Sequence, residues 1–407
     1  MKQSVLILAV FPAILFGAER PPQPLDPVKV IVDAERMILP LGLQPYMFQS
    51  ANGTLVLQAQ VSRKIAYPGV WKTVRSTDHG QSWHSWSPAK GQGEGPFTEG
   101  NVGQGKDGTI LVLEWLARGP DSNGYFTGNI WESRDDWLSL DGPYPAKMCV
   151  PEGKAGVDDG GDAISGIFLH RTLIEMPNGD WLTTAYGWFK EDSTPSTYQP
   201  KMNKTRTVLL RSRDRGRNWT LVSTIAVGPA VGEEGFDEPV LLRLAKGPRS
   251  GRFIVLMRTG RVTPIYQTES DDEGKTWTKA RLLAFNGVNP DLIEMKSGLL
   301  VAGFGWRTMA ESERKIVPRH EYKKDPKGKV LENHGRKPSV DPNQGNYLAF
   351  SVDQGSSWAQ VTKVTTGRNG DYVTLREVQP DNLLLVYNNE AKEAVGRLIR
   401  VLRNGTK

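Results

Sequence analysis

An octapeptide that recurs along the chain decides the fold. One copy reads Ser212-Arg-Asp214-Arg-Gly216-Arg-Asn-Trp219, which gives the pattern Ser-x-Asp-x-Gly-x-(Ser/Thr/Asn)-Trp. Complete copies also begin at Ser76, Ser270 and Ser351, and a damaged copy, Ser133-Arg-Asp135-Asp136-Trp137, lies between the first two. The aspartate accepts hydrogen bonds from backbone N–H groups, the glycine takes a positive φ, and the tryptophan is an apolar plug. Each copy therefore predicts a tight turn between two antiparallel strands.

A second pattern, made of a strand, a polar turn and another strand, alternates with the octapeptides. Its turns are centred on Gly53, Gly108, Gly179, Gly251, Gly298 and Asn382. An inner hairpin of this kind followed by an octapeptide hairpin makes a four-stranded antiparallel sheet, and six such sheets arranged radially make a six-bladed β-propeller. The last unit has no octapeptide and ends with the strand 395–402, so we expect the early strand 28–32 to close the ring. A two-layer β-sandwich explains this order of hairpins less well.

The composition and the N-terminal residues limit the class of protein. Of 407 residues only Cys149 is a cysteine, which excludes a disulfide framework and a multi-cysteine metal site. The sequence contains no loop with the usual spacing of calcium ligands, so we expect neither a metal nor a cofactor. Residues 1–18 combine Lys2, an apolar run and small residues, which is typical of a secretory signal peptide. The apolar run is shorter than the ~20 residues of a membrane-spanning helix. Residues 19–407 are then expected to form a single exported domain, secreted or periplasmic, that is monomeric and outside the membrane.

Positive charge gathers in one segment. The chain has 51 Lys and Arg residues against 45 Asp and Glu, and residues 311–337 hold nine of these bases and five of these acids. Tyr322 is the only aromatic residue in the segment, whereas a nucleic-acid groove interleaves basic and stacking aromatic residues. Nucleic acid is therefore not an expected partner. We interpret the segment as a solvated basic insert, and the alternative is that it attracts an anionic glycan toward a nearby site.

The inner strands of a propeller converge on its axis, so the residues at their ends meet at one mouth. The residues expected there are polar or aromatic, in contrast to the apolar strands between them: Gln44, Trp115, His170, Arg171, Trp188, Asp237, Glu238, Arg258, Asp291, Trp306, Arg307 and Tyr372. Sugars are bound by aromatic rings that stack on their faces and by a few polar groups that fix their orientation. We therefore expect a carbohydrate site with Trp115, Trp188 and Trp306 as the stacking residues.

The octapeptides resemble the Asp boxes of the sialidase superfamily, which lie on a six-bladed propeller, and the resemblance covers residues 26–404. Catalytic sialidases have a glutamate that opens one blade, an arginine that ends the next strand and a tyrosine that opens the last blade. The matching stretches are Phe236-Asp237-Glu238-Pro239, Leu256-Met257-Arg258 and Gly370-Asp371-Tyr372. The resemblance implies that Glu238 polarises Tyr372 as the nucleophile and that Arg258 binds an anionic group. A phenol avoids the repulsion that a carboxylate nucleophile would meet near a substrate acid.

The chain departs from the sialidase pattern at three places. The stretch Leu43-Gln44-Pro45 keeps the family's proline and lacks its arginine, and residues 59–72 lack the usual general-acid aspartate. Gln344 stands where a third arginine would fall. Arg171 and Arg307 are the candidates to replace the missing arginines. The candidates for the missing acid are Asp237, Asp291, Asp371, Glu99 and Glu114.

Together these features predict an exported, sialidase-like glycoside hydrolase that acts on a terminal, acidic sugar of a glycan. Two alternatives remain open. A polysaccharide lyase would use His170 or Tyr372 to abstract the proton next to a uronate carboxylate, which Arg171 or Arg258 would neutralise. A non-catalytic propeller would bind the glycan without cleaving it.

Overall fold

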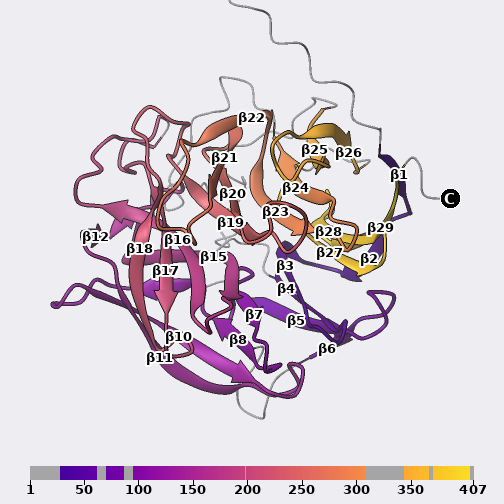
Figure 1. The fold of residues 1–407 in the computed structure, drawn as a ribbon, viewed down its shortest axis with the longest axis horizontal. Helices are drawn as coiled ribbons and strands as arrows, with labels where there is room; N and C mark the ends of the chain where they lie inside the picture. Colours follow the sequence, from indigo (N-terminus) through magenta and orange to yellow (C-terminus); the bar gives the residue numbers. More distant parts are fainter. Residues whose placement is uncertain are drawn as a thin grey trace, which may run out of the picture.

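The protein is all-β, as the sequence predicts. The computed structural model describes residues 28–61, 70–86, 95–197, 199–307, 343–365 and 370–403, and these residues form strands and turns without an α-helix. Accordingly, this part of the chain has no helix that is long and apolar enough to cross a membrane. Figure 1 shows the sheets arranged around a common centre. The expected signal peptide, residues 1–18, and the basic insert, residues 311–337, lie outside the described residues.

Three sheets consist of four antiparallel strands in sequence order, the form predicted for a propeller unit. The first contains β3 (Leu43–Gln49), β4 (Leu55–Gln60), β5 (Trp71–Ser76) and β6 (His84–Ser85). The second contains β19 (Asp237–Arg243), β20 (Phe253–Arg258), β21 (Pro264–Ser270) and β22 (Arg281–Asn286). The third contains β23 (Val288–Glu294), β24 (Leu300–Trp306), β25 (Gly345–Ser351) and β26 (Ala359–Lys363). In each sheet an octapeptide turn joins the third strand to the fourth, as predicted.

A five-stranded sheet joins the two ends of the described chain. It contains β27 (Val373–Gln379), β28 (Asn382–Asn388), β29 (Ala394–Leu402), β1 (Lys29–Val32) and β2 (Arg36–Leu39). Strand β1 runs antiparallel to β29, with Lys29 opposite Leu402, and β2 pairs with the earlier part of β29. The prediction that residues 28–32 complete the last unit is thus confirmed.

Residues 102–226 depart from the expected series of separate sheets. One ten-stranded sheet contains β7 (Val102–Gln104), β8 (Ile110–Leu113), β9 (Leu116–Arg118), β10 (Tyr125–Ser133), β11 (Asp141–Cys149), β12 (Gly153–Lys154), β15 (Gly166–Glu175), β16 (Trp181–Phe189), β17 (Arg206–Ser212) and β18 (Asn218–Ala226). Strands β13 (Gly156–Val157) and β14 (Ala163–Ile164) form a separate hairpin. Because β9 pairs with both β10 and β15, and β11 runs parallel to β18, the seven strands β9–β11 and β15–β18 close on themselves around a buried core. The nine-residue strands β10 and β11 are long enough to make this connection.

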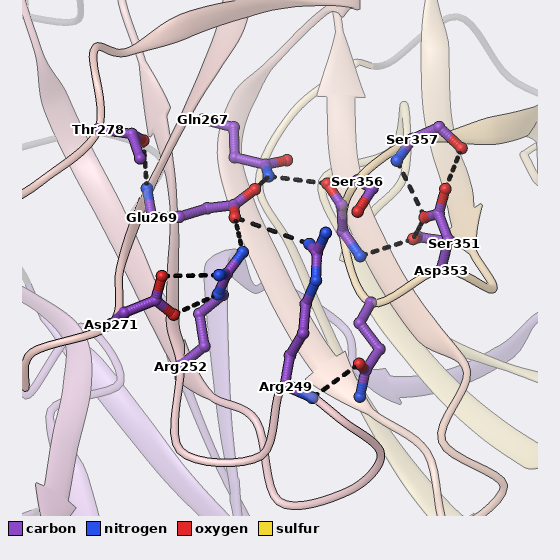
Figure 2. Close-up of polar contacts among 12 residues, drawn as sticks. Arg249, Arg252, Gln267, Glu269, Asp271, Thr278, Ser351, Asp353, Ser356 and Ser357 are labelled. Carbon is purple, nitrogen blue, oxygen red and sulfur yellow. Dashed lines mark hydrogen bonds and ion pairs between the residues drawn. The ribbon is translucent and has the colours of Figure 1, made fainter.

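The octapeptide turns have the hydrogen bonds that the sequence predicts. In the copy at 212–219, Asp214 Oδ1 accepts a hydrogen bond from Asn218 N at 2.9 Å, and the hydroxyl of Ser212 accepts one from Gly216 N at 2.8 Å. The aspartates of the other copies accept the equivalent bond at the same distance, including Asp135 of the damaged copy. Figure 2 shows the copy around Asp353 beside Gln267 of the preceding sheet. The Gln267 side chain donates to Gly355 O at 2.8 Å and accepts from Trp358 Nε1 at 2.6 Å, so this turn also links two units.

The glycine of the octapeptide at 212–219 lies against strand β10, and its replacement is expected to destabilise the fold. Gly216 has a φ of +82°, and a β-carbon there would lie 2.2 Å from Cδ1 of Ile130. We expect Gly216→Ala to lower the free energy of unfolding by about 3 kcal/mol, because strain at a positive φ adds to overpacking of the core. Gly179→Ala is the matched control, since its φ is +87° and no atom lies within 4 Å. Chemical denaturation should give a loss of about 1 kcal/mol for this control, and equal losses would exclude the packing contribution.

Candidate functional site

The strands nearest the centre share a backbone distortion. The inner strands β7, β15, β19, β23, β27 and β3 lie beside one another around the centre (Figure 1). Five non-glycine residues in or just before these strands have a positive φ: Gln44 (48°), Glu99 (46°), Arg171 (50°), Glu238 (39°) and Asn289 (47°). Gln44, Glu238 and Asn289 lie near the start of their strands, Glu99 precedes β7, and Arg171 lies midway along β15. In β3, β15, β19 and β23 the positive-φ residue falls within a register shift of the strand pairing. Such conformations are costly and concentrate at functional sites, where a bulge redirects a side chain.

Glu238 and Tyr372 meet at this end of the strands, as the resemblance implies. Tyr372 precedes β27, and its hydroxyl donates a hydrogen bond to Glu238 Oε1. The same oxygen accepts from Arg258 Nη1 at 2.8 Å, and Glu238 Oε2 accepts from Asn289 N at 2.9 Å. Burial favours the neutral acid, but Arg258, His170 and the Tyr372 hydrogen bond outweigh it and hold the pKa of Glu238 below its usual range. Glu238 is therefore an ionised carboxylate in contact with a half-buried phenol.

Tyr372 is positioned by close backbone packing. The preceding residue, Asp371, lies against Gly305 of β24, where a β-carbon would be only 2.0 Å from Asp371 O. Arg307, which directly follows the same strand, donates to Gly370 O at 2.9 Å and pairs with Asp371 at 2.7 Å. Arg307 is thus committed to holding the segment that carries Tyr372.

Arg258 is surrounded by carboxyl groups of the protein. Its Nη2 lies 3.0 Å from Glu234 Oε1, its Nη1 binds Glu238, and its Nε lies 3.8 Å from Asp237 Oδ1 and donates to Gly260 O. Burial and the neighbouring Glu234 raise the pKa of Asp237 well above its usual range, against the influence of Arg258. Glu234 lies in the loop before β19 and is not among the site residues predicted from sequence. Four acids within residues 233–238 were the signal that a buried cation must lie nearby.

Arg171 and Asp291 form a second buried ion pair. Arg171 Nη1 lies 3.0 Å from Asp291 Oδ2, and the Arg171 guanidinium stacks 4.7 Å from the centre of the Tyr46 ring. Asp291 also accepts from Arg376 and from Leu375 N, each at 2.9 Å. Burial alone would raise the pKa of Asp291, but Arg376 and Arg171 lower it. An ionised, fully bonded carboxylate does not fit the general-acid role for which Asp291 was a candidate.

His170 is buried inside the ring of strands. Its side chain is inaccessible to solvent, and its Nδ1 and Nε2 atoms lie 2.9 Å from Pro239 O and 3.0 Å from Asn289 Oδ1. Burial and the nearby Arg171 lower the pKa of His170 to about 4. The imidazole therefore lacks the access to substrate that a lyase base requires.

The tryptophans expected to stack on sugar differ in their exposure to solvent. Trp115 is 5% exposed and Trp188 is 1% exposed, with its Nε1 donating to Asn203 O at 2.9 Å, so both are packing residues. Trp306 is half-buried, with its ring centre 5.2 Å from that of Tyr347. Gln44 is buried and accepts a hydrogen bond from Gln60 Nε2 at 2.5 Å. Among the aromatic residues around Tyr372, Trp71 and Tyr186 are half-buried. The sequence places Tyr186 among the strand-end residues of the mouth, whereas sequence reasoning missed Trp71.

Glu99 stands out among the remaining candidates for the acid. Its side chain is buried, and it occupies the same distorted position before β7 that Glu238 occupies in β19. Burial and the charge of Glu238 raise the pKa of Glu99 to about 8, although Arg171 opposes the shift. Glu114 differs, because its carboxylate binds Asn129 at 2.8 Å and Arg118 at 3.1 Å. Among the described residues there is no group of three or more His, Cys, Asp or Glu side chains that could hold a metal ion.

Comparisons with known proteins bear on the fold. The sequence matches no protein-family model and no curated protein. A solved structure of a Dyadobacter fermentans protein of unknown function has a TM-score of 0.60 at 18% identity, covering 92% of this chain and 99% of the other. The Hadza microbial sialidase Hz136 gives 0.57 at 13% identity, covering 89% and 66%. The Penicillium chrysogenum α-L-arabinanase, complexed with arabinobiose, gives 0.56 at 16% identity, covering 92% and 98%. The chain therefore has the sialidase-like β-propeller fold that glycoside hydrolases such as these share.

Proposed function

We propose that the protein is a glycoside hydrolase in which Tyr372 is the nucleophile and Glu238 its general base. The observation that carries the proposal is the hydrogen bond from the Tyr372 hydroxyl to the ionised Glu238 carboxylate. A phenol is a weak nucleophile until an adjacent base accepts its proton. Arg258 and Asn289 hold Glu238 on its other sides, so the carboxylate is oriented toward the phenol.

The site favours hydrolysis over the two alternatives. Of the two candidate bases of a lyase, His170 is buried with both ring nitrogens engaged. A lyase that used Tyr372 would still need a cation for the uronate carboxylate, and Arg171 and Arg258 are paired with carboxylates of the protein. A binding protein has no need for an ionised carboxylate held against a tyrosine hydroxyl at a strained backbone position. The glycosidases that share the fold support the same interpretation.

We propose that the sugar is uncharged, which differs from the acidic sugar expected from sequence. That expectation rested on Arg258 as an anion-binding group, but Arg258 is held by Glu234 and Glu238. Arg171 and Arg307 are likewise paired, with Asp291 and Asp371. An added anion would lie beside these carboxylates, where repulsion is strong in a site of low dielectric. The arabinobiose bound by the Penicillium enzyme, a neutral disaccharide, supports an uncharged sugar here.

Two finer features of the molecule belong to the same proposal. In this proposal the ten-stranded sheet consists of two blades that are joined at β9 and β11. The propeller then has six blades, and each blade contributes one inner strand to the ring. Residues 1–18 direct export, so that the enzyme meets its glycan in a secreted or periplasmic location.

A panel of methylumbelliferyl glycosides tests the function. The neutral members are the α-L-arabinofuranoside, α-L-rhamnoside, α-L-fucoside and β-D-galactoside, and the acidic members are the α-N-acetylneuraminide and β-D-glucuronide. We expect fluorescence release from a neutral member, reduced at least about 100-fold by Glu238→Gln. Glu175→Gln is the control, because Glu175 lies at the opposite end of β15 and accepts a hydrogen bond from Lys106 N near the surface. Cleavage of acidic members alone would reject the uncharged sugar, and an unsaturated, ultraviolet-absorbing product from a uronate glycan would identify a lyase.

A further inference from the structure

We infer that Glu99 is the proton donor to the leaving group in this reaction. The inference rests on the proposed hydrolase function, because a proton donor has a role only if a glycosidic bond is cleaved. The sialidase pattern places its acid within the first unit, in the stretch that corresponds to residues 59–72, where this chain has none. Glu99 lies in the next unit, so the acid would come from a different strand.

The backbone presents Glu99 to the same centre as Glu238. Glu99 has a φ of 46° and Glu238 one of 39°. Glu99 lies just before β7, and Glu238 is at the start of β19. The carbonyl of Glu99 accepts a hydrogen bond from Arg171 N at 3.1 Å, which ties it to the next inner strand. The side chain is 6% exposed. Burial raises the pKa of Tyr46 and of Tyr186, and the charges of Glu99, Glu238 and Tyr372 raise both values further.

The Glu99 carboxyl group has no bonding partner among the described residues, in contrast to the other candidates for the acid. It makes no hydrogen bond or ion pair with the side chains or backbone of the described residues, although it is buried. Asp291 is bound by two arginines, Asp371 by Arg307, and Asp237 lies against Arg258. A buried carboxyl group without a protein partner is costly, and such groups are retained where a ligand completes them.

The two glutamates have opposite protonation states. Burial and Glu238 raise the pKa of Glu99 to about 8, so it carries its proton at neutral pH, whereas the pKa of Glu238 is lowered. Environments that push two carboxyl groups apart in this way identify an acid and a base.

The reaction then balances with these three residues and one water. Glu99 gives its proton to the glycosidic oxygen while Tyr372 Oη bonds to the anomeric carbon and passes its own proton to Glu238. The C–O bond breaks, its electrons leave with the oxygen, and the alcohol departs. In the second step Glu99 takes a proton from water, the water oxygen bonds to the anomeric carbon, and the tyrosine oxygen leaves and regains its proton from Glu238.

The test compares two leaving groups on one sugar, the sugar that the panel identifies. We expect Glu99→Gln to lower kcat/KM on the methyl glycoside by about 10³-fold. On the dinitrophenyl glycoside, whose leaving group departs without a proton, the loss should be below about tenfold. Wild-type activity on the methyl glycoside should fall above about pH 8, where Glu99 loses its proton, which gives the pH profile a basic limb. The pH profile of Glu99→Gln on the dinitrophenyl glycoside should lack this basic limb. Sodium azide should restore turnover of Glu99→Ala, with a glycosyl azide as product.

Each outcome decides one question. Equal losses on both leaving groups, or an unchanged basic limb in Glu99→Gln, would overturn the role of Glu99 and leave the hydrolase intact. No turnover of any panel member by the wild-type protein would overturn the proposed function, and the acid role with it. The wild-type pH profiles on the two glycosides test the role even if no variant folds, because only the methyl glycoside should show the basic limb strongly.

Discussion

Tyr372→Phe is expected to lower kcat/KM on a cleavable glycoside by about 10³-fold, equivalent to about 4 kcal/mol of transition-state stabilisation. The change removes only the hydroxyl that donates to Glu238. The phenyl ring keeps its edge-on contact with Tyr46, at 6.4 Å between ring centres, and Glu238 keeps Arg258 and Asn289. Activity should therefore fall without a large change in thermal unfolding, and both are measured on the same preparation.

Tyr266→Phe is the matched control for the loss of a hydroxyl. Tyr266 lies on β21, outside the site, and packs with its ring centre 5.6 Å from that of Phe236. It should keep wild-type activity. A fluorosugar inactivator built on the cleaved sugar should label Tyr372, which mass spectrometry of the digested protein can locate. Label on Glu238 with an active Tyr372→Phe would move the nucleophile to the carboxylate.

Arg258→Met is expected to lower the free energy of unfolding by about 4 kcal/mol at neutral pH, because it leaves buried carboxylates without their cation. Arg258 is 5% exposed and serves Glu234 and Glu238 together. Chemical denaturation of both proteins measures the difference. The control is Arg252→Met, since Arg252 also pairs with two carboxylates, Glu269 and Asp271, but near the surface (Figure 2). The side chain of Asp271 is 68% exposed, and ion pairs near the surface contribute at most about 1 kcal/mol.

The cost of Arg258→Met should depend on pH. In the wild-type protein the folded pKa of Glu238 is lowered, so its stabilising contribution is present above the unfolded value of about 4.3 and is lost as the pH falls through the folded value. Without Arg258, Glu234 and Glu238 can take up protons and become neutral at a higher pH. The difference between variant and wild type should therefore shrink between neutral pH and about pH 5. A pH-independent difference would show that Arg258 acts through packing alone.

The local turns were predictable because their information is local. Asp214, Gly216 and Trp219 lie within one octapeptide, and each of their hydrogen bonds closes within four residues. The meeting of Glu238 with Tyr372 was reached only through the sialidase resemblance, because no local pattern relates residues so far apart. The closure of the ring by residues 28–32 followed from a count of strands in the last unit.

Other features depend on partners that the sequence does not indicate. Strand β11 pairs in parallel with β18. No residue pattern within 141–149 indicates that β18 is its partner. Arg258 was interpreted as a substrate ligand through the sialidase resemblance, and the four acids within residues 233–238 did not by themselves identify Glu234 as its partner. Trp188 was expected to face a sugar, but it is covered on one side by Gly156, where a β-carbon would lie 1.9 Å from the indole. A strand-end position specifies the direction of a side chain and not what packs on it.

The five-stranded closing sheet determines how the molecule comes apart. Strand β1 pairs with β29, and the first octapeptide turn rests on the last unit, where a β-carbon at Gly80 would lie 2.5 Å from Leu384. Neither end of the described chain can detach without stripping hydrogen bonds and apolar contacts from the other. Fraying from the ends, the usual first step in unfolding of an open array of repeats, therefore has no low-cost starting point. The units should lose structure together, in one cooperative transition.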